Sequence, residues 1–202
     1  MLPFDVILFD VGGVLLTNGW DRNERAAAVA RFGLDAAELE RRHDRVFEAW
    51  ERGEIDVDQY LDAAVFYEPR DFSHAEFFEF ILAQSKLLED GAMGILGETA
   101  ASNYLLGALN NEARETNEYR FEKFGLRRYF EVAFSSCYVG LRKPDAAIYR
   151  RALDILGSKP ERTLFIDDRQ ENVDGAAAVG MAAIRFVGAE ALRAGLEKLG
   201  VL

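Results

Sequence analysis

Near the start of the chain, a wholly apolar run stops at an acidic residue. Val6-Ile7-Leu8-Phe9 is followed directly by Asp10, and the pair Gly12-Gly13 stands just beyond. A continuous β-prone run without alternating polar positions is typical of a strand buried on both faces of a parallel sheet. The glycine pair predicts a sharp turn after Asp10. The first strand of such a sheet is therefore expected to carry a carboxylate at its carboxyl end.

Four later segments have the same short, apolar character, and helical patterns separate them. The expected strands are 104–109, 130–135, 163–166 and 182–186, and the expected helices are 112–124, 144–156, 171–179 and 189–199. Pro144 suits a first helical position, and Gly125, Gly157 and Gly180 suit helix ends. This alternation predicts an α/β fold, a Rossmann-like parallel sheet of five strands sandwiched by helices.

Residues 17–88 follow a different pattern. Apolar residues recur there at helical spacing, and no strand candidate interrupts them. We therefore expect an all-α insert after the first strand, with its many aromatic residues packed in its interior. His43 is expected on a solvated face of a helix in this insert. Trp20 suits packing at the junction, with stacking on a substrate as the alternative.

Charge and cysteine content exclude several classes of protein. The formal net charge is -11, which disfavours binding to nucleic acids and to anionic membrane surfaces. Cys137 is the only cysteine, so no intrachain disulfide can form, and a cytoplasmic location is expected. The apolar run 2–16 is too short for a membrane span and is broken by acids and glycines. The oligomeric state stays open, with a monomer and a homodimer equally compatible.

Polar residues follow four of the expected strands. They are Asp10, Asn110-Asn111, Lys143 and Asp167-Asp168. The carboxyl ends of parallel strands meet at one edge of a sheet, where such folds bind ligands. Three carboxylates gathered there would raise one another's pKa unless a cation joined them. Mg²⁺ fits, because it prefers oxygen ligands and accepts phosphate oxygens, whereas zinc would favour His and Cys.

The other residues at this edge suit a phosphoryl group. Lys143 precedes a proline, which favours an extended backbone, and its ammonium can pair with Asp10 and with developing negative charge. Asn110 and Asn111 offer amide donors for phosphate oxygens. The turn at Gly12 and Gly13 leaves peptide N–H groups for an anion and a carbonyl for the metal.

In their order along the chain, these segments resemble the four motifs of the haloacid dehalogenase superfamily. The segments are Phe9-Asp10-Val11-Gly12-Gly13-Val14-Leu15, Leu109-Asn110-Asn111, Leu141-Arg142-Lys143-Pro144-Asp145 and Phe165-Ile166-Asp167-Asp168 with Asn172. The helical insert is similar to the subclass I cap, and 51–56 resembles a recurrent piece of it. The resemblance implies a core of 1–16 and 89–202 and a cap of 17–88. The subgroup it resembles most contains α-glucose-1-phosphate phosphatase-like proteins.

The resemblance also implies a reaction. Asp10 would attack phosphorus in a small phosphorylated metabolite, such as a sugar phosphate, and water would hydrolyse the aspartyl-phosphate. Mg²⁺ would be held by Asp10, the Gly12 carbonyl and Asp168, with Asp167 acting through a water molecule. Asn172 would orient the network around them.

Two positions depart from the family pattern. Gly12 stands where phosphatases of this family carry a second Asp as general acid and base, and Asn110 stands where Ser or Thr is common. Asp21, Glu24, His43 and Asp44 are the candidates for a replacement acid, and substrates with a good leaving group are favoured. One alternative is a catalytically silent relative that binds a phosphorylated ligand or partner. Another is a 2-haloacid dehalogenase, which Gly12 disfavours because those enzymes carry a bulky aromatic residue there.

Overall fold

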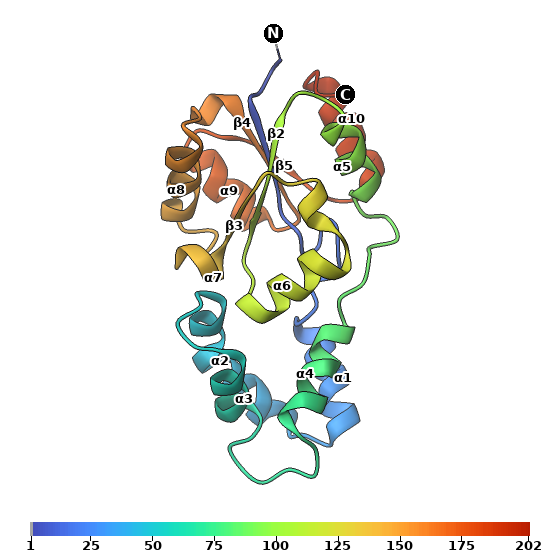
Figure 1. The fold of residues 1–202 in the computed structure, drawn as a ribbon, viewed down its shortest axis with the longest axis vertical. Helices are drawn as coiled ribbons and strands as arrows, with labels where there is room; N and C mark the ends of the chain where they lie inside the picture. The colour runs from blue at the N-terminus through green and yellow to red at the C-terminus, as the bar shows by residue number, and fades with distance from the viewer. Residues whose placement is uncertain (1) are drawn as a thin grey trace.

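The computed structural model describes residues 2–202 and contains a five-stranded sheet with all neighbouring strands parallel. The strands are β1 (Val6–Phe9), β2 (Leu105–Asn110), β3 (Val132–Ser135), β4 (Thr163–Asp167) and β5 (Ala182–Arg185). They lie in the order β3-β2-β1-β4-β5, so β1 is at the centre. Helices lie on both sides of the sheet (Figure 1). The predicted α/β fold with a Rossmann-like parallel sheet is confirmed.

Alternate residues of β1 enter two separate hydrophobic cores, one on each face of the sheet. Ile7 and Phe9 pack in the core that is shared with α5 (Met93–Ala100), α6 (Arg114–Lys123) and α10 (Ala189–Lys198). Val6 and Leu8 pack in the core that is shared with α8 (Ala146–Leu156) and α9 (Gln170–Ala178). Because side chains alternate along a strand, helices on both faces require an unbroken apolar run, as the sequence has.

Two helices begin two residues later than the sequence pattern predicts. α8 begins at Ala146 instead of Pro144, because the backbone N–H and carbonyl of Lys143 are both hydrogen-bonded to the Asn111 side chain. The Lys143–Pro144 peptide bond is cis. α6 begins at Arg114, since the Glu112 N–H donates to the Ser136 hydroxyl. The sequence analysis did not predict α5, α7 (Ser136–Val139) or the short 3-10 helices η1 (Leu126–Arg128) and η2 (Pro160–Arg162).

The segment between β1 and α5 folds into four helices. They are α1 (Arg22–Phe32), α2 (Ala36–Glu51), α3 (Val57–Ala64) and α4 (His74–Ala83). Each follows an Asp or Ser whose side chain accepts a backbone N–H of the first turn, namely Asp21, Asp35, Asp56 and Ser73. Their apolar residues form a third core around Trp50, Tyr60 and Phe77. We call this segment the helical insert.

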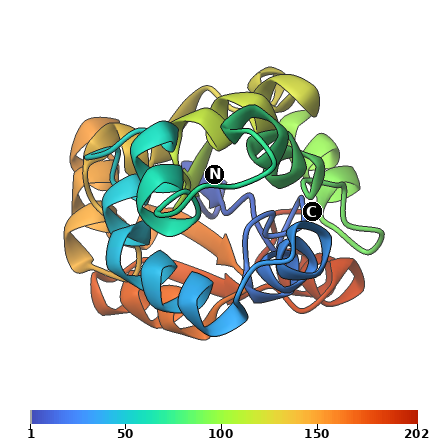
Figure 2. The same cartoon turned by 90° about the horizontal axis from the view of Figure 1, so that it is seen from below.

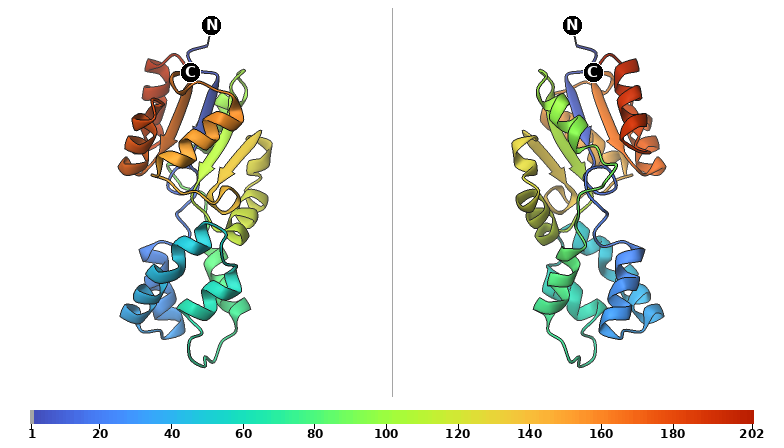
Figure 3. Two further views of the ribbon diagram at one scale, coloured as in Figure 1. Left: turned by 90° about the vertical axis from the view of Figure 1, so that its left-hand side faces the viewer. Right: turned by 90° about the vertical axis from the view of Figure 1, so that its right-hand side faces the viewer.

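The chain enters and leaves the helical insert at one place. Thr17 donates its N–H to the Lys86 carbonyl over 2.9 Å, and Leu16 and Leu87 form an isolated antiparallel bridge. The guanidinium of Arg120 on α6 donates to the Thr17 carbonyl and pairs with Glu112. The helical insert lies beyond the carboxyl ends of the strands and away from both chain termini (Figure 3), and its helices face the viewer when the molecule is seen from below (Figure 2). Within residues 2–202, the structure has no helix of the length and apolarity that a bilayer crossing requires.

Candidate active site

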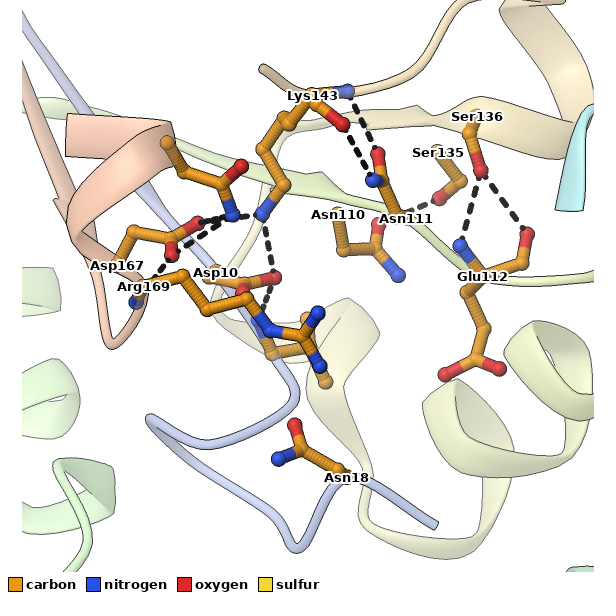
Figure 4. Close-up of polar contacts among 12 residues, drawn as sticks. Asp10, Asn18, Asn110, Asn111, Glu112, Ser135, Ser136, Lys143, Asp167 and Arg169 are labelled. Atoms are coloured by element: carbon orange, nitrogen blue, oxygen red, sulfur yellow. Dashed lines mark hydrogen bonds and ion pairs between the residues drawn. The ribbon is translucent and has the colours of Figure 1, made fainter. Parts of the chain in front are cut away.

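The ammonium group of Lys143 lies between two carboxylates at the carboxyl edge of the sheet (Figure 4). Its Nζ lies 2.9 Å from Asp10 Oδ1 and 2.6 Å from Asp167 Oδ2. Carboxylate oxygens of Asp10, Asp167 and Asp168 all lie within 4.8 Å of one another. The structure thus brings together the three acids and the lysine that the sequence placed in separate segments.

The protein itself uses both oxygens of Asp167. The Asn172 side chain donates to Oδ1 over 2.9 Å and to Oδ2 over 3.0 Å, and the Arg169 backbone N–H donates to Oδ1 over 2.8 Å. Asn172 stands in the first turn of α9, directly after the loop that follows β4. Asp167 is fully buried. It is therefore a fixed acceptor that holds the Lys143 ammonium in place.

Asp168 is bound differently, because its Oδ1 is buried and has no hydrogen-bond partner within residues 2–202. A buried carboxylate oxygen without a partner is energetically unfavourable. Gly13 allows the close approach, since its φ is +71° and a Cβ there would stand 2.2 Å from Asp168 Oδ2. A free oxygen of this kind, next to Asp10 and Asp167, suits a hard cation with oxygen ligands.

Burial and the charge of Asp167 raise the pKa of both Asp10 and Asp168. Burial raises the pKa of Asp10 to about 8; the Lys143 charge opposes this rise and the Asp167 charge adds to it. Burial, followed by the charge of Asp167, also raises the pKa of Asp168. One ammonium group does not offset three carboxylates, so a cation at this edge would stabilise the ionised forms.

The two asparagines after β2 lie in different environments. Asn111 lines the cavity over the site, and its side-chain amide donates to the Lys143 carbonyl over 2.9 Å. Asn110 points into the protein, where its amide donates to Asn117 over 2.9 Å and its carbonyl accepts from Ser135 over 2.8 Å. Asn110 is not among the residues that line the cavity. The structure brings only Asn111 of the two expected phosphate donors to the site.

Asn18 occupies the space next to Gly12 that a side chain at position 12 would need. Asn18 Oδ1 lies 3.0 Å from the point where a Cβ on Gly12 would stand, and both residues line the cavity. Asn18 belongs to the segment that leads from the β1 turn into the helical insert, and it points towards the site in Figure 4. The sequence analysis missed Asn18, since nothing in the local pattern indicates that it folds back over the turn.

A cavity of about 320 Å³ lies between the carboxyl edge of the sheet and the helical insert. Trp20 and Phe47 provide apolar surface, and Arg25, Arg142 and Arg169 provide positive charge. The sequence analysis missed these arginines as site residues. Two of them were indicated by position, because Arg142 directly precedes Lys143 and Arg169 directly follows Asp168.

An ion pair joins the helical insert to the sheet at the rim of the cavity. Arg142 Nε lies 2.5 Å from Glu51 Oε2, and its Nη1 lies 2.9 Å from Glu48 Oε1. Burial raises the pKa of Glu51 to about 7, although the Arg142 charge opposes the rise. Next to this pair, Gly53 has φ +69°, and a Cβ there would stand 2.4 Å from the Cys137 carbonyl oxygen. The segment 51–56 is thus the part of the insert that packs closely on the core.

His43 corrects the sequence prediction, because it is buried instead of solvated. Only 3% of its surface is exposed, and its Nδ1 lies 2.8 Å from the Tyr60 hydroxyl. His43 lies four residues after Leu39 and seven before Trp50, on the buried face of α2, where it lines the cavity and packs on Tyr60 of α3. Burial lowers the pKa of His43 to about 3, so the imidazole is neutral near pH 7.

The other candidates for a replacement acid are also placed by the structure. Asp21 and Glu24 form the capping box that begins α1, and Asp21 also lies 3.2 Å from Arg169 Nη2. Asp21 and Asp44 line the cavity, whereas Glu24 does not. Two of the four sequence candidates are therefore carboxylates at the cavity wall.

The acidic cluster and its lysine lie at the carboxyl edge of an open parallel sheet, which is where proteins of the α/β class bind their ligands. A family model described as haloacid dehalogenase-like hydrolase matches residues 4–180. The chain belongs to this family.

One relative supports this assignment, and two solved structures share the fold. The chain is 31% identical over 197 residues to the chloroplastic flavin mononucleotide hydrolase 1 of Arabidopsis thaliana, covering 97% of this chain and 78% of that one. It is similar in fold to a haloacid dehalogenase family enzyme of Bacteroides thetaiotaomicron solved with magnesium and inorganic phosphate. The TM-score is 0.74 at 21% identity, over 90% of this chain and 93% of that one. L-2-haloacid dehalogenase of Xanthobacter autotrophicus has a TM-score of 0.65 at 19% identity, over 98% and 84% of the two chains.

Proposed function

We propose that this hydrolase is a Mg²⁺-dependent phosphatase of small phosphorylated metabolites, with Asp10 as the nucleophile. The observation that carries the proposal is the Lys143 ammonium, which contacts Asp10 and Asp167 beside the unpaired oxygen of Asp168. Phosphoryl transfer depends mainly on positioning and on compensating negative charge, and these groups supply both.

The donor atoms at the site fit a magnesium ion. Asp10, Asp168 and the Gly12 carbonyl would hold it, since they are hard oxygen ligands and Asp168 Oδ1 has no other partner in the described chain. Asp167 would act through a water molecule, because the protein already uses its two oxygens. The bound ion would supply positive charge next to the phosphoryl oxygens.

The reaction has two steps, both at Asp10. A carboxylate oxygen of Asp10 attacks phosphorus, the bond from phosphorus to the ester oxygen breaks, and the leaving oxygen takes a proton from water in the cavity. Water then attacks the aspartyl-phosphate and gives a proton to the hydroxide left by the first step, which releases inorganic phosphate and restores the Asp10 carboxylate. Lys143 stabilises the charge that develops on the phosphoryl oxygens. Asn172 and Asn111 hold Asp167 and the Lys143 backbone in place.

Proton supply favours esters with a good leaving group. Residue 12 has no side chain to act as general acid, and this loss typically costs about 10²- to 10⁴-fold in rate. Flavin mononucleotide and α-glucose 1-phosphate are the first two substrates to test. The first is hydrolysed by the Arabidopsis relative according to its name, and the second follows from the motif resemblance.

We also propose a division of the chain into two domains. Residues 1–16 and 89–202 would form the catalytic core, and residues 17–88 would form a cap that holds the organic part of the substrate. Three facts support this: the hydrophobic core of the insert, the single place at Thr17 and Lys86 where the chain enters and leaves it, and the cavity between the two parts.

A panel of phosphate esters assayed with and without Mg²⁺ tests the proposal. Hydrolysis is expected only with the metal, and Asp10→Asn is expected to lower kcat by at least about 10³-fold. Asp5→Asn is the matched control, because Asp5 lies before the same strand at the opposite edge of the sheet and pairs with Arg162. No hydrolysis of any ester would favour the silent relative that Gly12 suggests. Full activity of Asp10→Asn would refute the nucleophile.

A further inference from the structure

Three buried side chains of the helical insert form one hydrogen-bonded chain at the wall of the cavity. Trp20 Nε1 lies 2.7 Å from the Tyr60 hydroxyl oxygen, and this oxygen lies 2.8 Å from His43 Nδ1. Tyr60 is fully buried. In such an environment each donor and acceptor is expected to have a partner.

The order of this chain determines where its protons lie. The Trp20 indole can only donate, so the Tyr60 oxygen accepts from it. Tyr60 then has one proton to donate, and within residues 2–202 its only acceptor is His43 Nδ1. A proton on Nδ1 would leave the buried hydroxyl without an acceptor, which is unfavourable. His43 is therefore the tautomer that carries its proton on Nε2.

The imidazole is also held neutral and fixed in orientation. Burial, followed by the nearby Arg25 guanidinium, lowers the pKa of His43, whereas the charges of Glu40 and Asp21 oppose this effect. The ring packs against Phe47 with the centroids 4.3 Å apart, and it meets Tyr60 edge to face at 5.9 Å. A ring flip would break the hydrogen bond to Tyr60.

The protonated nitrogen is the one that is left for a ligand. His43 lines the cavity together with Asp44 and Phe47 of the same helix. Nδ1 is occupied by Tyr60, and no residue in the described part of the chain forms a hydrogen bond with Nε2. Nε2 is not among the fully buried polar atoms that lack a partner in the described chain, so it is open to the cavity, where an acceptor on the ligand can take the place of water.

We propose that His43 is a specificity-determining residue that donates its Nε2–H to an uncharged oxygen or nitrogen acceptor on the organic part of the substrate. Tyr60 and Trp20 are the positioning residues that keep the proton on Nε2. The inference rests on the proposed phosphatase function and narrows its substrates to phosphate monoesters with a carbonyl, ether or ring-nitrogen acceptor. An ester without that acceptor would leave the N–H unpaired and bind less well.

Two substitutions at His43 distinguish the roles of the two ring nitrogens. His43→Gln keeps an N–H donor near the position of Nε2, whereas His43→Asn leaves an amide only near the position of Nδ1. The measurement is the ratio of kcat/KM for flavin mononucleotide or α-glucose 1-phosphate to kcat/KM for phenyl phosphate, which lacks a suitable acceptor. His43→Asn is expected to lower this ratio about 100-fold, mainly through KM, and His43→Gln less than about 10-fold. An unchanged ratio in His43→Asn, or equal losses on all esters, would overturn the proposal.

A second measurement uses the unsubstituted histidine and needs no turnover. The chain has two histidines, so imidazole ¹⁵N signals are few, and His74→Gln assigns the exposed one by its loss. The His43 proton is expected on Nε2, and flavin mononucleotide or α-glucose 1-phosphate added to Asp10→Asn protein is expected to shift that signal. A proton on Nδ1 would refute the tautomer.

The two proposals fail in different ways. Hydrolysis of esters without any response of the His43 Nε2–H would overturn the role of His43 and leave the phosphatase function intact. A response of Nε2–H to the ester without hydrolysis by the unsubstituted protein would support the His43 contact and refute the phosphatase function.

Discussion

The side-chain oxygen of Asn18 lies 3.0 Å from the point where a Cβ on Gly12 would stand. The family's phosphatases carry a side chain at position 12. Here Asn18, from the start of the helical insert, fills that space. The backbone of Gly12 itself does not require glycine, because its φ is outside the left-handed region, unlike that of Gly13.

Restoring the acid at Gly12 is expected to require removal of Asn18. Gly12→Asp alone should raise kcat on phenyl phosphate only slightly, because the new carboxyl group collides with the Asn18 amide. The double variant with Asn18→Gly should raise kcat by about 10²-fold, since a general acid then protonates the leaving oxygen. Equal kcat values for the single and double variants would contradict this steric account.

Gly13→Ala is expected to abolish the metal response, whereas Gly33→Ala is not. Both glycines have left-handed φ values, +71° and +63°, so both substitutions should cost about 1–3 kcal/mol in backbone strain. Only the Cβ at position 13 would meet Asp168, at 2.2 Å, while nothing lies within 4 Å of one at position 33. Thermal unfolding with and without Mg²⁺ compares them. An equal Mg²⁺ shift in both variants would argue against Asp168 as a ligand.

Stability without metal is expected to fall as the pH rises. Burial raises the pKa of Asp10 from its ordinary value of 3.8 to about 8. Between these values the folded protein keeps a proton that the unfolded chain releases, so the free energy of unfolding decreases with increasing pH. Mg²⁺ competes with that proton. The increase in Tm that Mg²⁺ produces should therefore be several degrees larger near pH 8 than near pH 5.

Asp10→Asn serves as the control for this pH dependence. Its amide does not titrate, so the difference between the Mg²⁺ effects at the two pH values should shrink. A Mg²⁺ shift of Tm that is equal at both pH values in the unsubstituted protein would contradict the prediction.

Removing Arg142 alone is expected to destabilise the protein more than removing both Arg142 and Glu51. Arg142→Met should lower the free energy of unfolding by about 3 kcal/mol, because it leaves the buried Glu51 carboxylate without its closest counter-charge. Adding Glu51→Leu should recover most of the loss. Urea unfolding measures both, and failure of the double variant to recover would count against the explanation.

Arg193→Met is the matched control for Arg142→Met. Arg193 pairs with Glu98 at the same distance of 2.5 Å, but the two side chains are 41% and 50% exposed. Solvent screening limits such exposed pairs to about 0–1 kcal/mol. A loss as large as that of Arg142→Met would show that burial is not the cause.

The sequence alone was sufficient to predict the parallel sheet and the gathering of acidic residues at its carboxyl edge. The three central strands are short apolar runs whose consecutive residues, such as 6–9, are buried on both faces of the sheet. Asp10 and Asp167 end two of these runs, and parallel strands bring such ends together whatever the details of packing. The fold and the meeting of Asp10, Lys143 and Asp167 could therefore be predicted from the order of residues along the chain.

Only the tertiary structure decided the environment of individual polar side chains. Asn110 and Asn111 are neighbours of identical type, yet one is buried with Asn117 and Ser135 and the other lines the cavity. The hydrogen-bond partner of the buried His43 is Tyr60, which comes from another helix. Burial of a polar group depends on hydrogen bonds from segments far away in the chain. Local sequence patterns do not predict those partners. The sequence therefore indicates where the acids gather, and the tertiary structure decides which neighbouring residues complete the site.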